Sequence, residues 1–210
     1  MATSAHLTLT RPAAPSARRA LAAPALLAAP LFLLTAALLT LTNSDALRAW
    51  GWTAGDHHGV PWPSGLAVLP HGWLQAAAFA CTGAALIALA VALPHRGRGL
   101  ALAACGLGLT AAALPLDPPV GDPGTLASWI QSWHAAVHAG GFVLAGLAAP
   151  LAIAATRRRI DVALAVALTT AALLGGTPGW YAYLAGLLIW VDVIAIRVLL
   201  PTRSVRKEAA

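Results

Sequence analysis

The chain has 210 residues, of which 59% are hydrophobic and only 10% are charged, and its mean hydropathy is +0.76. A soluble domain carries about 25% charged residues, so this composition excludes an ordinary water-soluble domain and indicates an integral membrane protein. The excess of 13 Lys and Arg over 7 Asp and Glu does not indicate nucleic-acid binding. The basic residues lie in short clusters between apolar runs, and not along one face of a helix.

The N-terminal part of the chain contains a tail, a first apolar run and a long loop. Residues 1–23 are predicted to be a disordered, basic cytoplasmic tail. The apolar run that follows is longer than the about 7–15 apolar residues of a secretory signal. We therefore expect an uncleaved transmembrane helix that begins near Pro24 and ends near Thr42. Residues 43–72 form a polar and aromatic loop, and long loops often carry function.

Five further apolar runs complete a predicted membrane domain over residues 24–200. They cover residues 73–93, 99–116, 129–156, 161–174 and 180–200, and the fifth is short for a span of about 20 residues. Residues 201–210 form a second basic tail. The predicted fold is an all-α bundle of six transmembrane helices.

The positions of the arginines predict the orientation of this bundle. Nearly all positive charge lies in the two tails and in residues 94–98 and 157–159. The positive-inside rule then places both termini in the cytoplasm. Seven of the eight tryptophans lie in or next to the outside loops. An interfacial aromatic belt accounts for most of them, and its one-sidedness suggests that the outer end holds a ligand.

The candidate catalytic residues are Asp117, which follows the third run in the sequence LPLDPP, and the pair His134 and His138 in the fourth run. The i,i+4 spacing puts both imidazoles on one helix face, about 5–6 Å apart. Ionisable groups at membrane depth are generally functional. We further expect the substrate to contact six residues at the outer side and in the last run. They are His71, Trp73, Gln75 (next to Ala76), Trp129, Trp133 and Asp192.

Three interpretations of the histidine pair remain open. The imidazoles could join neighbouring helices by hydrogen bonds. They could share a zinc ion with Asp117 or His71, and the zinc would activate water. They could also perform metal-free acid/base or proton-relay chemistry with Asp117. No metal or other cofactor is assigned, and Cys81 and Cys105, inside apolar runs, are interpreted as packing residues.

Three stretches together resemble a known family: HGWLQAAAFACTGAALIALAVAL at 71–93, the LPLDP that ends the third run, and the downstream WHAAVHAGGF. They are similar to the bacterial six-span membrane proteins grouped as domain of unknown function 998. The resemblance covers roughly residues 25–200 and rests on Trp73, Phe79, Pro115, Asp117, Pro118 and His134. It implies a multi-pass protein of the bacterial inner membrane and says little about activity.

These observations lead to three hypotheses of function. The first is a membrane-embedded enzyme that acts by acid/base chemistry on a lipid or isoprenoid-like substrate in an outward-facing Asp/His pocket. The second is a small proton-coupled transporter or export accessory protein that uses Asp192 and the histidines. The third is a non-catalytic membrane scaffold. The bilayer is the expected partner, nucleic acid is not, and the sequence does not define the oligomeric state.

Overall fold

The computed structural model describes residues 14–49, 51, 62–114, 128–156 and 158–200, apart from the side chains of residues 128 and 129. Every regular element within these ranges is a helix. The N-terminal part contains α1 (Pro15–Ala22), η1 (Ala23–Leu27), α2 (Ala28–Thr42), α3 (Ser44–Ala49) and η2 (Gly65–Val68). The remainder contains α4 (Trp73–Ala92), α5 (Arg96–Ala111), α6 (Ser128–Ala154), α7 (Arg159–Leu174) and α8 (Gly176–Leu199).

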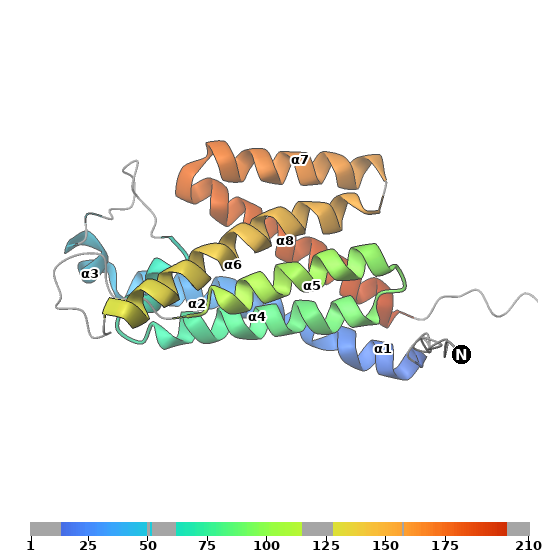
Figure 1. Cartoon of the computed structure of the whole chain (residues 1–210), viewed down its shortest axis with the longest axis horizontal. Coiled ribbons are helices and arrows are strands. Elements are labelled where there is room, and N and C mark those ends of the chain that lie inside the picture. Colours follow the sequence, from blue (N-terminus) through green and yellow to red (C-terminus); the bar gives the residue numbers. More distant parts are fainter. Residues whose placement is uncertain (1–13, 50, 52–61, 115–127, 157, 201–210) are drawn as a thin grey trace, which may run out of the picture.

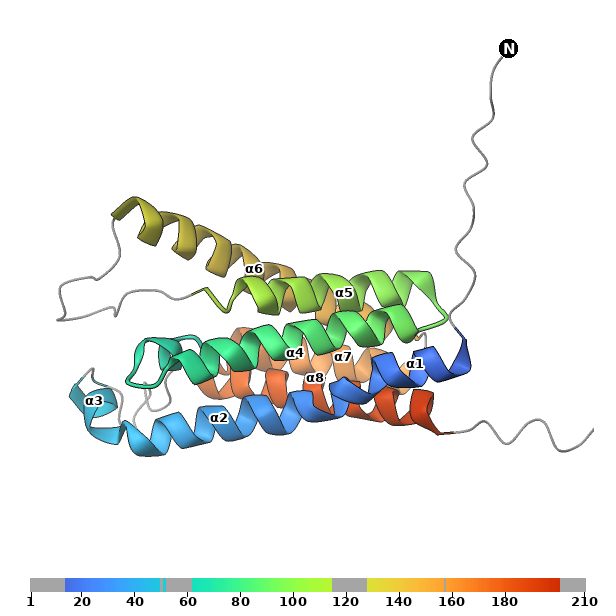
Figure 2. The same cartoon turned by 90° about the horizontal axis from the view of Figure 1, so that it is seen from below.

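The long helices lie side by side in one elongated bundle (Figures 1 and 2). The helices α4, α5 and α6 alternate in direction and pack in chain order, and α7 packs against both α6 and α8. The aromatic end of the bundle carries α3, η2 and the first turns of α4 and α6, with Trp62, Trp73 and Trp133. The opposite, basic end carries the α4–α5 and α6–α7 turns and the end of α8, with Arg96, Arg98, Arg158, Arg159 and Arg197.

The first apolar helix begins earlier than the sequence predicted. Pro15–Thr42 form one helical segment of 28 residues that is long and apolar enough to cross a membrane, whereas the predicted start was near Pro24. Pro24 lies in the 3-10 helix η1 and Pro30 lies in the first turn of α2. Because proline lacks a backbone N–H, these positions lose helical hydrogen bonds, and the segment changes from α to 3-10 and back. Residues 1–13 of the predicted tail lie outside the described residues.

Four helical segments of the described chain are long and apolar enough to cross a membrane, where the sequence predicted six spans. They are Pro15–Thr42, Trp73–Ala92, Ile130–Ala154 and Gly176–Leu199. The other two predicted spans became α5 and α7, which have 16 residues each. At 1.5 Å per residue they are about 24 Å long, shorter than the about 30 Å hydrocarbon core.

The predicted loop at 43–72 contains two short helices, α3 and η2, while its residues 52–61 lie outside the described ranges. The buried side chain of Asn43 joins the two ends of this loop. Its Nδ2 donates to the Leu39 carbonyl at 3.0 Å and to the Pro70 carbonyl at 3.4 Å. The loop therefore starts and ends at the same place, next to the first turn of α4.

Two pairs of glycines set the contact between α4, α5 and α6. A Cβ added to Gly83 of α4 would collide with the backbone of Gly106 on α5, and a Cβ added to Gly106 would collide with Gly83. Gly108 on α5 and Gly141 on α6 form the same reciprocal contact. Small residues allow helix backbones to approach this closely in a membrane. The helix α5 is therefore held tightly between its two neighbours.

Large aliphatic side chains cover the outer surface of the bundle. Leu34 on α2, Leu147 on α6 and Leu173 on α7 are 68%, 65% and 76% exposed. A water-soluble protein rarely exposes so much contiguous apolar surface. Together with the four apolar helices, this surface identifies the chain as a membrane protein in contact with a lipid bilayer.

We expect Gly141→Ala to lower the free energy of unfolding by about 1–3 kcal/mol, the usual cost of overpacking, because the new methyl group collides with the Gly108 backbone. The matched control is Gly140→Ala, since a Cβ at Gly140 meets no atom within 4 Å. Both changes raise helix propensity equally. Thermal unfolding in detergent compares them, and equal melting temperatures would contradict the proposed contact.

Candidate functional site

Of the predicted catalytic residues, the structure describes the two histidines but not Asp117. Asp117 and the side chain of Trp129 lie outside the described residues. His134 and His138 both lie on α6, which is helical from Ser128 to Ala154. His134 is half-buried, whereas His138 is only 7% exposed. The second histidine of the pair is therefore the one that enters the bundle.

His138 lies where the end of α5 meets α6. The backbone carbonyls of Ala112 and Leu114 are close to its imidazole. The centroid of its ring is 5.0 Å from that of Phe142, one turn further along α6. Its Nδ1 is buried and has no hydrogen-bond partner among the described residues. The imidazole therefore lies within reach of the carbonyls that end α5, and its Nδ1 is the ring nitrogen without a partner in the described chain.

Gln75 on α4 is the second buried polar side chain at this level of the bundle. It is completely buried, and neither Oε1 nor Nε2 has a partner in the described part of the chain. Gln75 precedes Phe79 by four residues, as His138 precedes Phe142, and the two phenylalanine rings are 5.7 Å apart. Since α4 and α6 run in the same direction (Figure 1), Gln75 and His138 lie at similar heights in the bundle.

The other predicted substrate-binding residues do not line the same interior. Trp73 and Trp133 are 66% and 67% exposed at the aromatic end, as expected for an interfacial belt. His71 is also exposed, and its φ of +62° lies in the left-handed region. Among the described residues no group of three metal-ligating side chains comes together. His71 therefore does not complete a metal site with His134 and His138.

Asp192 lies at a different depth from the histidines. Trp180 on α8 contacts Phe142, with 6.2 Å between ring centroids. Asp192 follows Trp180 by 12 residues, which is a rise of about 18 Å toward the basic end. His138 lies on the opposite side of Phe142, toward the aromatic end. A small substrate therefore cannot contact Asp192 and His138 at the same time.

An apolar pocket that the sequence did not predict is separated from His138 by the ring of Phe142. Its volume is about 330 Å³, and it is formed by α6, α7 and α8. Phe142, Trp180 and Tyr183 form its aromatic wall, and Val143, Leu147 and Leu173 at its rim are exposed. The pocket therefore opens toward the membrane, and its wall at Phe142 also contacts His138.

Tyr183 fixes the wall of this pocket. Its hydroxyl donates to the Gly146 carbonyl at 3.2 Å and to the Ala145 carbonyl at 3.4 Å. Its ring packs on Trp180 with the centroids 5.5 Å apart. The tyrosine thus connects α8 to α6 across the pocket. The aromatic residues at 142, 180 and 183 were the available sequence signal, but only tertiary packing brings them together.

The arrangement has two chemical capabilities. The apolar pocket can hold a hydrocarbon chain, because its lining is almost free of polar groups. Outside the pocket lining, the buried imidazole of His138 and the amide of Gln75 can form hydrogen bonds with a polar group, and an imidazole can also transfer a proton.

Comparison with known proteins adds no relative. No family model, no curated protein and no solved structure matches the chain. The resemblance to domain of unknown function 998 stays a prediction from the sequence.

We expect Gln75→Leu to raise the free energy of unfolding by about 1 kcal/mol, because it removes a buried amide that has no partner among the described residues. The control is Asn43→Leu, since the Asn43 amide is also buried but donates to Leu39 and Pro70. That change should lower stability by about the same amount. Melting temperatures in detergent provide the measurement, and a loss of stability in both variants would show that Gln75 has a structural role.

Proposed function

We propose that the protein is a membrane-embedded enzyme that acts by acid/base chemistry on a lipid or isoprenoid-like substrate. The observation that carries the proposal is the apolar, membrane-facing pocket whose Phe142 also contacts the buried imidazole of His138. A hydrocarbon chain would enter between Val143, Leu147 and Leu173 from the bilayer. Its polar group would then lie toward His138 and Gln75.

The proposal includes roles for the predicted residues. Asp117 acts as the acid or base, and His134 and His138 relay protons to it. Gln75 donates to and accepts from the polar group of the substrate, because both of its amide atoms are buried without a partner in the described residues. His71, Trp73 and Trp133 act as interfacial residues at the aromatic end, where amphipathic rings are favoured, and Trp129 is assigned the same role from its place in the sequence.

We also propose that α5 and α7 cross the bilayer, so that the protein has six spans and two cytoplasmic termini in a bacterial inner membrane. The support comes from packing and chain order. The helix α5 packs against both α4 and α6, and α7 packs against both α6 and α8. If α4, α6 and α8 all cross in the same direction, the helices between them must return the chain. Local thinning of the bilayer accommodates a short helix at modest cost.

The enzyme hypothesis predicts that Asp117→Ala and His138→Ala reduce turnover at least about 100-fold, the usual contribution of a general acid or base. The assay uses purified protein in liposomes that are made from a bacterial extract of lipids and isoprenoids. Mass spectrometry measures how much of each lipid or isoprenoid the protein consumes. Membrane insertion should be unchanged in both variants.

A pocket-filling variant provides a control that is independent of the acid/base residues. Gly146 lies in the pocket opposite Trp180, so Gly146→Leu should reduce turnover by occupying the space for the chain. Gly140→Leu adds the same side chain on α6 where a Cβ meets no neighbouring atom, and it should leave turnover unchanged. Full activity in Asp117→Ala and in His138→Ala would remove the proposal.

A second candidate, a proton-coupled transporter, is favoured by one observation. Oδ1 of Asp192 is buried in α8 and has no partner among the residues that the structure describes. A carboxylate at this depth costs about 2.5–3.5 kcal/mol on insertion scales, which a proton-binding role would explain. We expect Asp192→Asn to abolish uptake that depends on a proton gradient in proteoliposomes, whereas Asp45→Asn at the exposed ion pair with Arg48 should not affect it. Gradient-driven uptake that persists in Asp192→Asn would exclude this function.

A further inference from the structure

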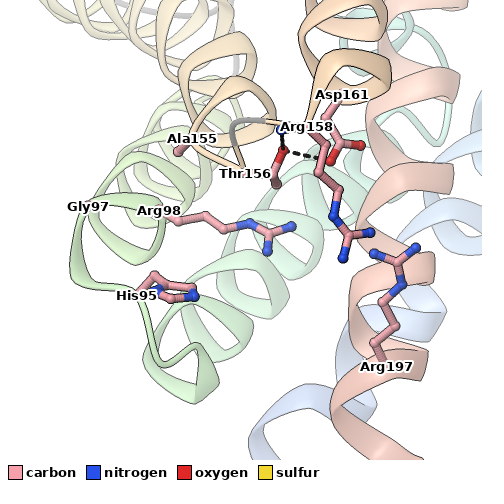
Figure 3. A pocket seen from close by; sticks show the side chains of 8 residues that line it. All are labelled: His95, Gly97, Arg98, Ala155, Thr156, Arg158, Asp161 and Arg197. Atoms are coloured by element: carbon pink, nitrogen blue, oxygen red, sulfur yellow. Dashed lines mark hydrogen bonds between the residues drawn. The ribbon is translucent and has the colours of Figure 1, made fainter.

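A cavity of about 610 Å³ lies at the basic end of the bundle, at the opposite end from the proposed active site (Figure 3). Its walls come from three helices and one turn: the start of α5, the turn between α6 and α7, the start of α7 and the last turns of α8. Its polar lining consists of His95, Arg98, Thr156, Arg158, Asp161 and Arg197. The cavity is therefore built from side chains that are far apart in sequence.

Positive charge dominates this cavity. The guanidinium groups of Arg98, Arg158 and Arg197 extend toward its interior (Figure 3). Asp161 is the one carboxylate in its lining, and its Oδ2 accepts a hydrogen bond from the Thr156 hydroxyl at 2.6 Å. In the described part of the chain the only ion pair joins Arg48 to Asp45 at the other end of the molecule. Three cations thus face one anion, and none of them is paired with it.

Arg98 is held inside the bundle, where an arginine near a membrane surface ordinarily extends toward water. Its guanidinium carbon lies 4.8 Å from the centre of the Trp190 ring, a cation–π contact. Its Nε and Nη2 are buried and have no hydrogen-bond partner in the described ranges. Asp161 attracts this guanidinium, and Arg197 and Arg158 repel it. A bound anion would supply hydrogen-bond acceptors to the buried donors.

Two helix N-termini add to the positive potential. The helix α5 begins at Arg96 and α7 begins at Arg159, and residues of both first turns line the cavity, where the first N–H groups of a helix have no partner within the helix. Helix N-termini favour anions, especially phosphate. Gly97 lines the cavity and has open space where a Cβ would be, so an anion can approach the α5 backbone.

We propose that this cavity binds a phosphate-bearing group, as a phosphomonoester or a diphosphate. Three guanidinium groups and one carboxylate leave two positive charges, which match the charge of about −1.5 to −2 on a phosphomonoester at neutral pH. Arginine forks bind phosphate oxygens in pairs. The cavity is larger than a phosphate group and leaves space for the molecule that carries it. That molecule is either a lipid of the adjoining leaflet or a soluble phosphate compound.

Orientation in the membrane does not by itself explain these arginines. Arg96 and Arg159 lie at the same end, are exposed, and supply positive charge without lining the cavity. They satisfy the positive-inside rule as well as the cavity residues do. Arg158 and Arg197 are exposed as well, and what distinguishes them, together with Arg98, is that all three line one cavity.

The test uses the full-length protein in nanodiscs of phosphatidylcholine, with inorganic pyrophosphate as the soluble probe and phosphatidic acid as the lipid probe. Calorimetry measures pyrophosphate binding, and native mass spectrometry measures retention of phosphatidic acid. We expect Arg98→Gln and Arg197→Gln to weaken binding of either probe at least about tenfold, because each change removes hydrogen bonds to a charged group. Binding of pyrophosphate in neutral nanodiscs identifies a soluble ligand, and retention of phosphatidic acid that pyrophosphate does not displace identifies a lipid.

The matched control is Arg159→Gln, which removes the same charge from the same end but not from the cavity. It should change the affinity less than about twofold, because Arg159 does not line the cavity and its charge acts on a ligand there only at a distance, through salt solution that screens it. If Arg98→Gln does not fold, Arg158→Gln takes its place, since Arg158 is exposed and lies before α7. The proposal is overturned if neither probe binds, or if Arg159→Gln weakens binding as much as the cavity variants do.

Discussion

The close approach of three helix backbones at two glycine pairs determines where the functional groups of this bundle lie. Gly83 and Gly106 join α4 to α5, and Gly108 and Gly141 join α5 to α6. Because backbone contacts allow little sliding, they fix the heights of the three helices relative to one another. Gln75 and His138 are thereby held at one level near the aromatic end, and the start of α5 is held at the basic end beside α8.

Unpartnered polar groups occur at both ends of this otherwise apolar interior. His138 and Gln75 lie between α4, α5 and α6, and Arg98 lies against Trp190 of α8. Along α8, Trp180 of the apolar pocket and Trp190 beside Arg98 are ten residues apart, a rise of about 15 Å. The apolar pocket and the arginine cavity are therefore separate in the bundle.

The sequence predicted the order of the helices and the position of the basic end because apolar runs and arginine clusters are local signals. It predicted α5 less well. The arginines and glycines at 96–99 looked like a turn, yet they form the first turn of the helix. The helix ends at Ala111, a few residues before Pro115, because proline disfavours helical conformation in the residue before it. These two shifts produce the 16-residue helix.

The candidate sites were less predictable than the helices, because residues from distant runs form them. His138 was expected from its spacing to His134, but only packing distinguishes the buried imidazole from the half-buried one. The apolar pocket combines Phe142 with Trp180 and Tyr183 from another helix. The arginines were interpreted as orientation signals alone. A buried polar group without a partner costs about 1–3 kcal/mol, while a whole domain is stable by about 5–15 kcal/mol. Polar side chains at Gln75 and Arg98 therefore lower the stability of the bundle relative to apolar residues at the same positions, a cost that the sequence pattern alone does not show.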